Sequence, residues 1–308
     1  MTVARQVVAR RTYLISRRCT QRQLLLRPDR KVEQIYLYCL AEAVIRFGIT
    51  LHAFIAMSNH QHLIVRDDKA NFPEFLAHFH KMVAKAMNAL RGRRENFWAT
   101  EQPNAVYLVD AHDRFRKLVY LLANPVADHL VERVSDWPGA SSLGLHLTGR
   151  TITVKRPRGF FRADGNMPEE VTLHLERPEG FEFLTDEEWT AKVAEAVCGA
   201  ERRARDDRAS RGVRVLGRKA VLRAATTDTP RSVEARERLR PTVACHDKAR
   251  RRWELERLLE FRRARSAALL RFTAEEADVV FPHGTYRVRG IFLVAPALPA
   301  AQTFARSA

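Results

Sequence analysis

The first half of this 308-residue chain predicts an α+β fold, in which helices pack on one face of an antiparallel sheet. Two short apolar stretches are joined by a two-residue turn, which is typical of a β-hairpin. Longer segments repeat apolar residues every three or four positions, which indicates amphipathic helices. Their order is strand, helix, strand, strand, helix, strand, helix. This order is typical of a ferredoxin-like domain.

The first elements can be placed along the sequence one by one. Thr12–Ser16 reads as a strand and leads into an arginine-rich turn. Pro28 suits the first turn of a helix, and Gly48 can end that helix. The apolar stretches Leu51–Met57 and His60–Arg66 then predict the hairpin.

The next elements follow the hairpin. A strong apolar stripe between Phe72 and Leu90 predicts a second helix. Ala105–Val109 reads as a further strand, and Asp110 is a suitable N-cap for a third helix, which carries Tyr120. We therefore expect one domain over residues 1–148.

The second half has a different character. Residues 149–184 are rich in turn signals and predict an irregular linker, whereas 185–295 predict a basic and mainly helical region. Phe281–Val294 reads as a turn and a strand that can fold back onto the body, and residues 296–308 read as a tail.

The composition indicates a polyanionic partner. The formal net charge is +17 and the pI is about 10.4, and residues 200–252 alone hold 17 basic and 7 acidic residues. An arginine-rich surface without such a partner is the alternative, and composition alone does not separate the two.

The cysteines and the apolar runs exclude other classes of protein. The four cysteines are scattered without a Cys-x-x-Cys pair, which argues against a zinc ribbon or a disulfide framework. The sequence shows no signal-type start and no apolar run near the roughly 20 residues of a membrane helix. We therefore expect a cytoplasmic protein.

His60 and His62 lie two apart in the second strand of the hairpin. Alternate side chains of a strand share a face, so both imidazoles can point at one ion. The same spacing recurs at His78 and His80, but there a helix turns the two side chains in nearly opposite directions. On spacing alone, a metal role for the first pair is no more than one possibility.

Tyr120 and Asn124 lie four apart on the third helix and therefore share a face. On a helical wheel Tyr120 falls opposite the apolar residues of that helix, which are Phe115, Leu118, Val119 and Leu122. A core tyrosine would lie with them, so this one is either a surface residue or a site residue. Asn124 precedes Pro125 and could instead cap a short helix over 125–131.

Together these motifs resemble the REP-associated tyrosine transposases (RAYTs) of the single-tyrosine HUH transposase family. The resemblance covers roughly residues 10–145 and rests on His60-Gln61-His62 and on Tyr120-Leu-Leu-Ala-Asn124-Pro125. Flanking stretches agree as well: Ile15–Arg17, Leu51–Asn59 and Val126–Val131. One position departs from the pattern, since Gln61 stands where the family has a bulky apolar or aromatic residue.

The resemblance implies a metal-dependent enzyme that cleaves and rejoins single-stranded hairpin DNA through a 5′-phosphotyrosine. Tyr120 would be the nucleophile, and His60, His62 and Asn124 would hold a divalent Mg²⁺ or Mn²⁺ ion. The protein would act as a monomer or homodimer. Two alternatives stay open. One is a domesticated protein of the same fold that binds single-stranded DNA without cutting it, which Gln61 favours. The other is an RNA-hairpin-binding module that uses the same basic surface without catalysis.

Basic residues near these motifs and in the C-terminal half are candidates for phosphate contacts. Lys117 could in addition stabilise the phenolate of Tyr120. The full set of candidates is Arg17, Arg18, Arg22, Arg91, Arg93, Arg94, Lys117, Arg250, Arg251 and Arg252. For each of them, a solvated surface position is the alternative.

Overall fold

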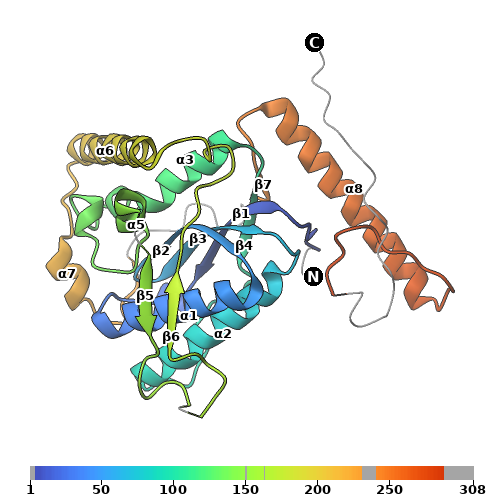
Figure 1. Ribbon diagram of the computed structural model, residues 1–308, viewed down its shortest axis with the longest axis horizontal. Helices are drawn as coiled ribbons and strands as arrows, with labels where there is room; N and C mark the ends of the chain where they lie inside the picture. Colours follow the sequence, from blue (N-terminus) through green and yellow to red (C-terminus); the bar gives the residue numbers. More distant parts are fainter. Residues whose placement is uncertain (1–3, 150, 163, 231–240, 288–308) are drawn as a thin grey trace.

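A five-stranded sheet forms the centre of the protein (Figure 1). The computed structural model describes residues 4–149, 151–162, 164–230 and 241–287. The strand order is β2-β3-β1-β4-β7, and the strands are β1 Arg11–Arg18, β2 Thr50–Ala56, β3 His60–Asp67, β4 Asn104–Leu108 and β7 Val243–Ala244. The first four run antiparallel, and β7 pairs parallel to β4. The α+β class and the ferredoxin-like strand order are therefore confirmed, with one parallel strand added from the C-terminal half.

Helices surround this sheet, and a separate hairpin, β5 Ile152–Lys155 with β6 Glu170–Leu173, lies beside it. The described α-helices are α1 Arg30–Phe47, α2 Phe72–Arg91, α3 Ala111–Leu122, α4 Asn124–Ala127, α5 Leu143–Thr148, α6 Asp186–Arg211, α7 Arg218–Arg223 and α8 Lys248–Thr273. Two 3-10 turns, η1 Thr20–Arg22 and η2 Val134–Asp136, complete the elements seen in the described residues.

Helices α1 and α2 pack on one face of the sheet, as the periodicity predicts. The Asp29 side chain accepts a hydrogen bond from Val32 N and so caps the start of α1. Gly48 ends α1 in the left-handed region at φ 63°, which glycine adopts at little cost. Buried aromatic residues between the two helices, such as Tyr36 and Phe79, form the centre of this core.

The second face of the sheet is covered as well, by α3 and α6. Leu118 and Leu122 of α3 share an apolar cluster with Ile64 of β3 and with Trp189 and Val193 of α6. Strand β2 is buried along its whole length, as expected when both faces of a sheet are packed. The sequence prediction included helices on one face only, because the partner of the second face lies far along the chain.

The C-terminal half adds several elements to the body. The stretch 149–184, predicted to be irregular, contains the β5–β6 hairpin, whose Val154 and Leu173 join the core under α1. The boundary predicted at residue 148 stays a prediction. None of the helices in the described residues is long and apolar enough to span a membrane.

The region after α8 returns to the start of the chain. Val7 N donates to Gly284 O at 2.9 Å, and Gln6 forms a bridge with Thr285. The predicted fold-back of Phe281–Val294 is thus seen as far as residue 287. Its remainder and the tail at 296–308 lie outside the described residues.

Candidate active site

The two histidines begin β3 at the end of the sheet where β1 finishes. Register pairs His60 with Arg18 and His62 with Ser16. The centroids of the two imidazole rings are 4.9 Å apart, and the His62 ring lies 5.9 Å from that of Tyr120. The strand therefore brings both histidines to the side of the sheet that α3 covers.

Each imidazole is held in place through its Nδ1 atom. For His60 this atom lies 2.7 Å from Asn59 Oδ1, and for His62 it lies 2.7 Å from Ser16 Oγ. An amide oxygen only accepts, so Nδ1 of His60 carries the proton and its Nε2 keeps a lone pair. Hydrogen bonds of this kind orient metal-binding histidines in proteins and select their tautomer.

Helix α3 brings Tyr120 to the same place. Its first turn is capped by Asp110, whose side chain accepts from Asp113 N at 2.8 Å. Leu118 and Leu122 are fully buried against the sheet, whereas the Tyr120 side chain is 49% exposed. The Lys117 Nζ atom lies 5.2 Å from the centroid of the Tyr120 ring. The helical wheel thus placed Tyr120 correctly, away from the core.

Asn124 connects Tyr120 with His60. It is 5% exposed, and its side chain is hydrogen-bonded to both His60 and Tyr120. The N-cap of α4 is Ala123, and no side chain caps that helix. The capping alternative for Asn124 is therefore wrong, because its side chain turns toward the histidines instead of the end of the helix.

The electrostatics of the site keep both imidazoles and the phenol uncharged at neutral pH. Burial, helped by Arg18 and Arg22, lowers the pKa of His60 to about 4 although the bond to Asn124 opposes this. Burial and the neighbouring His60 and Lys117 hold the pKa of His62 well below its usual range. Burial and the charge of Asp128 raise the pKa of Tyr120. Neutral imidazoles have the lone pairs that metal binding requires.

The donor set fits a divalent cation. Two neutral imidazoles of β3 lie beside the Asn124 amide of α4, and mixed nitrogen and oxygen ligands suit Mn²⁺, Mg²⁺ and borderline metals. The assignment of His60, His62 and Asn124 as ligands remains a proposal.

A second group of potential ligands lies at the other end of α3. Ligand atoms of Asp110, Asp113 and Cys245 lie within 4.8 Å of one another. Sequence reasoning missed this group because Cys245 lies far along the chain. Each residue already has a partner: Cys245 Sγ donates to Asp110 Oδ2 at 3.6 Å, and His246 N donates to Asp113 Oδ2 at 2.8 Å. The group therefore fastens the end of β7 to the start of α3.

Gln61 faces away from the histidines into the opposite core. The Tyr36 hydroxyl donates to its Oε1 at 2.8 Å, and its Nε2 lies 2.7 Å from His80 Nε2. His80 Nδ1 in turn lies 2.8 Å from the Arg17 guanidinium. Burial, helped by the charge of Arg17, holds the pKa of His80 well below its usual range. His78 turns the other way and bonds Glu42 at 2.7 Å, as the helical spacing predicts.

The basic candidates from the sequence separate into groups. Arg18 and Arg22 lie close enough to His60 to lower its pKa, and Lys117 lies beside Tyr120. Arg17 points inward to His80, and Arg91 is paired with Asp29 at 3.4 Å. The remaining candidates lie elsewhere, with Arg93 half-buried, Arg94 exposed, and Arg250, Arg251 and Arg252 at the start of α8.

Comparisons with known proteins yield structural matches only. No protein-family model matches the chain, and neither does any curated protein. A solved structure of a REP-associated tyrosine transposase bound to a REP hairpin matches with 18% identity and a TM-score of 0.41, over 58% of this chain and 98% of that one. The chain resembles the REP-associated tyrosine transposases. A provisionally assigned transposase from Deinococcus radiodurans R1 matches with 19% identity and a TM-score of 0.29, over 39% of this chain and 95% of that one. At these scores the likeness by itself decides neither reaction nor substrate.

Proposed function

We propose that this protein cleaves and rejoins single-stranded DNA, with Tyr120 as the nucleophile. One observation carries the proposal. Tyr120 and Asn124 meet His60 and His62 at one end of the sheet, although about sixty residues separate the two pairs in the sequence. The hairpin form of the substrate follows from the family that the motifs resemble.

The reaction is a transfer of the phosphoryl group between two oxygens. The Tyr120 hydroxyl loses its proton, and its oxygen attacks the scissile phosphorus. The bond from phosphorus to the 3′ oxygen breaks, and that oxygen takes up a proton. The 5′ phosphate then stays on Tyr120, and a free 3′ hydroxyl can reverse the step. One phosphodiester replaces another, so rejoining needs no nucleotide hydrolysis.

The residues of the site suit this step. The half-exposed ring of Tyr120 can be reached by a DNA strand, and the ammonium of Lys117 beside it would stabilise a phenolate. Asn124 is hydrogen-bonded to both Tyr120 and His60 and so fixes the position of the tyrosine hydroxyl relative to that histidine. A divalent ion held by His60, His62 and Asn124 would polarise the scissile phosphate and offset its developing charge. Hydrogen bonds with Asn59 and Ser16 fix the orientation of the His60 and His62 rings, respectively.

A protein of the same fold that binds single-stranded DNA or RNA hairpins without cutting is the second candidate. Gln61 favours it, because this residue departs from the family pattern. Its side chain lies on the opposite face from the histidines, however, and has its own partners there. The departure therefore leaves the candidate ligand set intact.

Detection of a covalent adduct separates the two candidates. The probe is a pool of 3′-labelled single-stranded oligonucleotides with randomised hairpin stems, because the 3′ side of the cut stays on the protein. Incubation with Mn²⁺ and denaturing electrophoresis should reveal a shifted, labelled band. Chelator and Tyr120→Phe should each abolish this band, whereas Tyr107→Phe, at a tyrosine on β4 outside the site, should retain it.

The outcomes are distinct. An undiminished band from Tyr120→Phe would remove this residue as nucleophile, and a full band in chelator would remove the metal. Binding of the pool without any adduct in Mg²⁺ or Mn²⁺ would favour the non-cleaving protein.

A further inference from the structure

The segment 213–228, which contains α7, crosses the end of the sheet that holds the candidate site. We call it the strap. At one end Leu216 N donates to His129 O at 2.9 Å and Gly217 N donates to Leu130 O at 3.0 Å. These carbonyls directly follow Asp128, whose charge acts on Tyr120. The strap is therefore fixed beside the helix pair that carries Tyr120 and Asn124.

The other end of the strap is fixed beside the histidines. Asp228 O accepts from Leu24 N at 3.0 Å, and Ala224 O accepts from the Arg27 side chain at 3.1 Å. The loop 24–27 also reaches the hairpin turn before His60, since Leu26 N donates to Ser58 O at 2.9 Å. The strap thus spans from one half of the candidate site to the other.

The middle of the strap is anchored in the core. Val221 of α7 is 3% exposed and belongs to the same apolar cluster as Leu118 and Leu122 of α3. The Arg218 side chain donates to Asp136 O at 3.3 Å. These contacts fix which side chains of α7 face outward.

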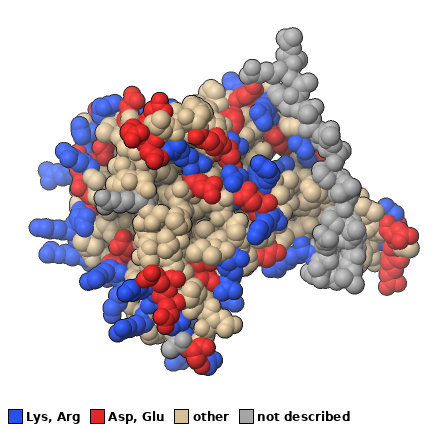
Figure 2. Space-filling model, in the orientation of Figure 1, with Lys and Arg blue, Asp and Glu red and all other residues tan. Residues whose placement is uncertain are grey.

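The outward side of the strap carries uncompensated positive charge. Arg214, Lys219 and Arg223 are exposed, and within the described residues none of them forms an ion pair. Figure 2 shows Lys and Arg side chains gathered along the edge of the molecule that carries α7 and the start of α1. When surface cations bind the phosphates of a nucleic acid, they release the counterions that were condensed on it. This release is the main source of affinity for nucleic-acid backbones.

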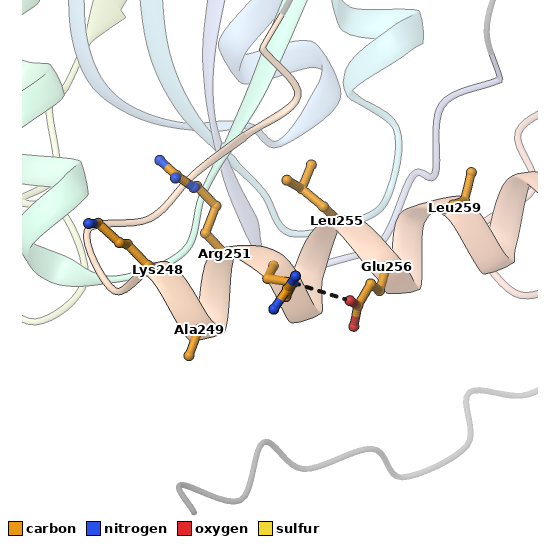
Figure 3. Close-up of a pocket in the computed structure, with 7 residues that line it drawn as sticks. Lys248, Ala249, Arg251, Leu255, Glu256 and Leu259 are labelled. Atoms are coloured by element: carbon orange, nitrogen blue, oxygen red, sulfur yellow. Dashed lines mark ion pairs between the residues drawn. The ribbon is translucent and has the colours of Figure 1, made fainter.

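Helix α8, which belongs to the same basic stretch of sequence, lies elsewhere. It extends beside β7 at the opposite end of the molecule from α7 (Figure 1). Its first turns line a shallow groove of about 510 Å³ with Lys248, Arg251, Leu255 and Leu259 (Figure 3). Arg252 is paired there with Glu256 at 3.7 Å. The structure therefore divides one charged block into a part at the candidate site and a part remote from it.

We propose that the strap is the surface that binds the phosphate backbone of single-stranded DNA next to the scissile bond, through Arg214, Lys219 and Arg223. The placement of this DNA next to a scissile bond rests on the proposed function, whereas the binding of single-stranded DNA to the strap does not. Single-stranded DNA that reaches Tyr120 passes the strap, because the strap is bonded to the loop after α4 and to the loop 24–27, which bonds the turn before His60. Helix α8 lies instead beside β7.

The test compares two double variants with equal loss of charge. Lys219→Gln with Arg223→Gln changes the strap, and Arg251→Gln with Arg263→Gln changes two exposed arginines of α8. The probe is a fluorescein-labelled, mixed-sequence single-stranded 30-mer, and its anisotropy is measured between 50 and 300 mM NaCl. Circular dichroism and thermal melting confirm that both variants fold like the parent.

The expected size of the effect follows from counterion release. Each lost phosphate contact reduces the salt slope by about 0.7, so two contacts reduce it by about 1.4 and weaken binding roughly 25-fold at 0.1 M salt. The strap variant should show this change, and the α8 variant should keep the parent slope. An unchanged slope for the strap variant, or an equal change for the α8 variant, would overturn the inference.

The adduct assay distinguishes failure of this inference from failure of the proposed function. At saturating DNA the strap variant should form as much adduct as the parent, with the half-saturating concentration raised in proportion to the lost affinity. If the parent protein forms no adduct, the proposed cleavage is refuted, whereas the salt dependence of DNA binding to the strap remains valid. Normal adduct formation at all DNA concentrations in the strap variant would refute the strap alone.

Discussion

Replacing Gln61 by leucine should destabilise the protein, because the amide satisfies two groups that have no access to water. The side chains of Tyr36 and Gln61 are 0% exposed, and that of His80 is 2% exposed. Leucine fills a similar volume but offers neither a donor nor an acceptor. The Tyr36 hydroxyl and the His80 ring would each lose the hydrogen bond seen at 2.8 and 2.7 Å, respectively.

The magnitude can be worked out from these two groups. A buried polar group left without a partner costs roughly 1–3 kcal/mol, so two such groups cost roughly 2–6 kcal/mol. The apolar leucine returns on the order of 1–2 kcal/mol through burial. We expect a net loss of about 1–4 kcal/mol, a large share of the roughly 5–15 kcal/mol that stabilises a typical domain.

Urea unfolding followed by tryptophan fluorescence measures this loss. Trp98 is a suitable reporter because its indole N–H donates to His80 O at 2.9 Å. The matched variant is Tyr36→Phe, which removes the hydroxyl that Gln61 accepts from. Tyr36→Phe should lower the free energy of unfolding by about 1 kcal/mol in the parent. In the Gln61→Leu background it should leave that free energy unchanged or raise it.

Two results would refute the reasoning. An unchanged unfolding midpoint in Gln61→Leu would mean that the chain from Tyr36 to His80 contributes nothing to the fold. A large gain in DNA cleavage would mean that Gln61 impairs the site, and that the parent is a decayed enzyme.

Four further outcomes are expected. His60→Ala and His62→Ala should each abolish adduct formation while affinity for the single-stranded probe changes less than about twofold, since phosphate contacts dominate binding; a full adduct band in either would count against the metal site. Ser16→Ala should weaken Mn²⁺ binding roughly 10-fold in calorimetry through the freed His62 ring, and unchanged binding would show that the ring needs no such support. Burial lowers the pKa of His146 to about 4, whereas the unfolded chain has a value near 6.5. Below pH 6.5 the unfolded state therefore binds the proton first, and the free energy of unfolding falls by about 1.4 kcal/mol per pH unit. Melting curves should show a lower Tm at pH 5 than at pH 7. A chain truncated after residue 147 should lack a cooperative melting transition, because it loses Trp189 and the rest of α6 from the apolar cluster on the second face of the sheet. A sharp transition would show that the first 147 residues fold on their own.

Local pattern predicted the parts of the site that lie within single elements. Alternation in a strand placed His60 and His62 on one face and Gln61 on the other, and the wheel of α3 separated Tyr120 from the leucines. These are consequences of the two backbone periods, and they need no knowledge of distant contacts.

Long-range contacts were beyond such reasoning. Neither the pairing of β7 with β4 nor the proximity of Cys245 to Asp110 has a periodic signal, because each joins residues more than a hundred positions apart. The role of Asn124 was undecided for a related reason. Asn before Pro is a good cap by local rules, and only the neighbouring strand shows that its side chain has other partners.

The pairing of β4 with β7 has a consequence for synthesis on the ribosome. About 135 residues separate Leu108 from Val243, so at ~5–20 residues per second the edge of β4 waits roughly 7–27 s for its neighbour. During that interval the nascent chain exposes unpaired backbone groups along β4, which are a template for pairing with another chain. The final turn at Gly284, which bonds Val7, emerges later still. Slow synthesis or a stalled ribosome should therefore favour aggregation of this protein, and its native sheet is completed only late in translation.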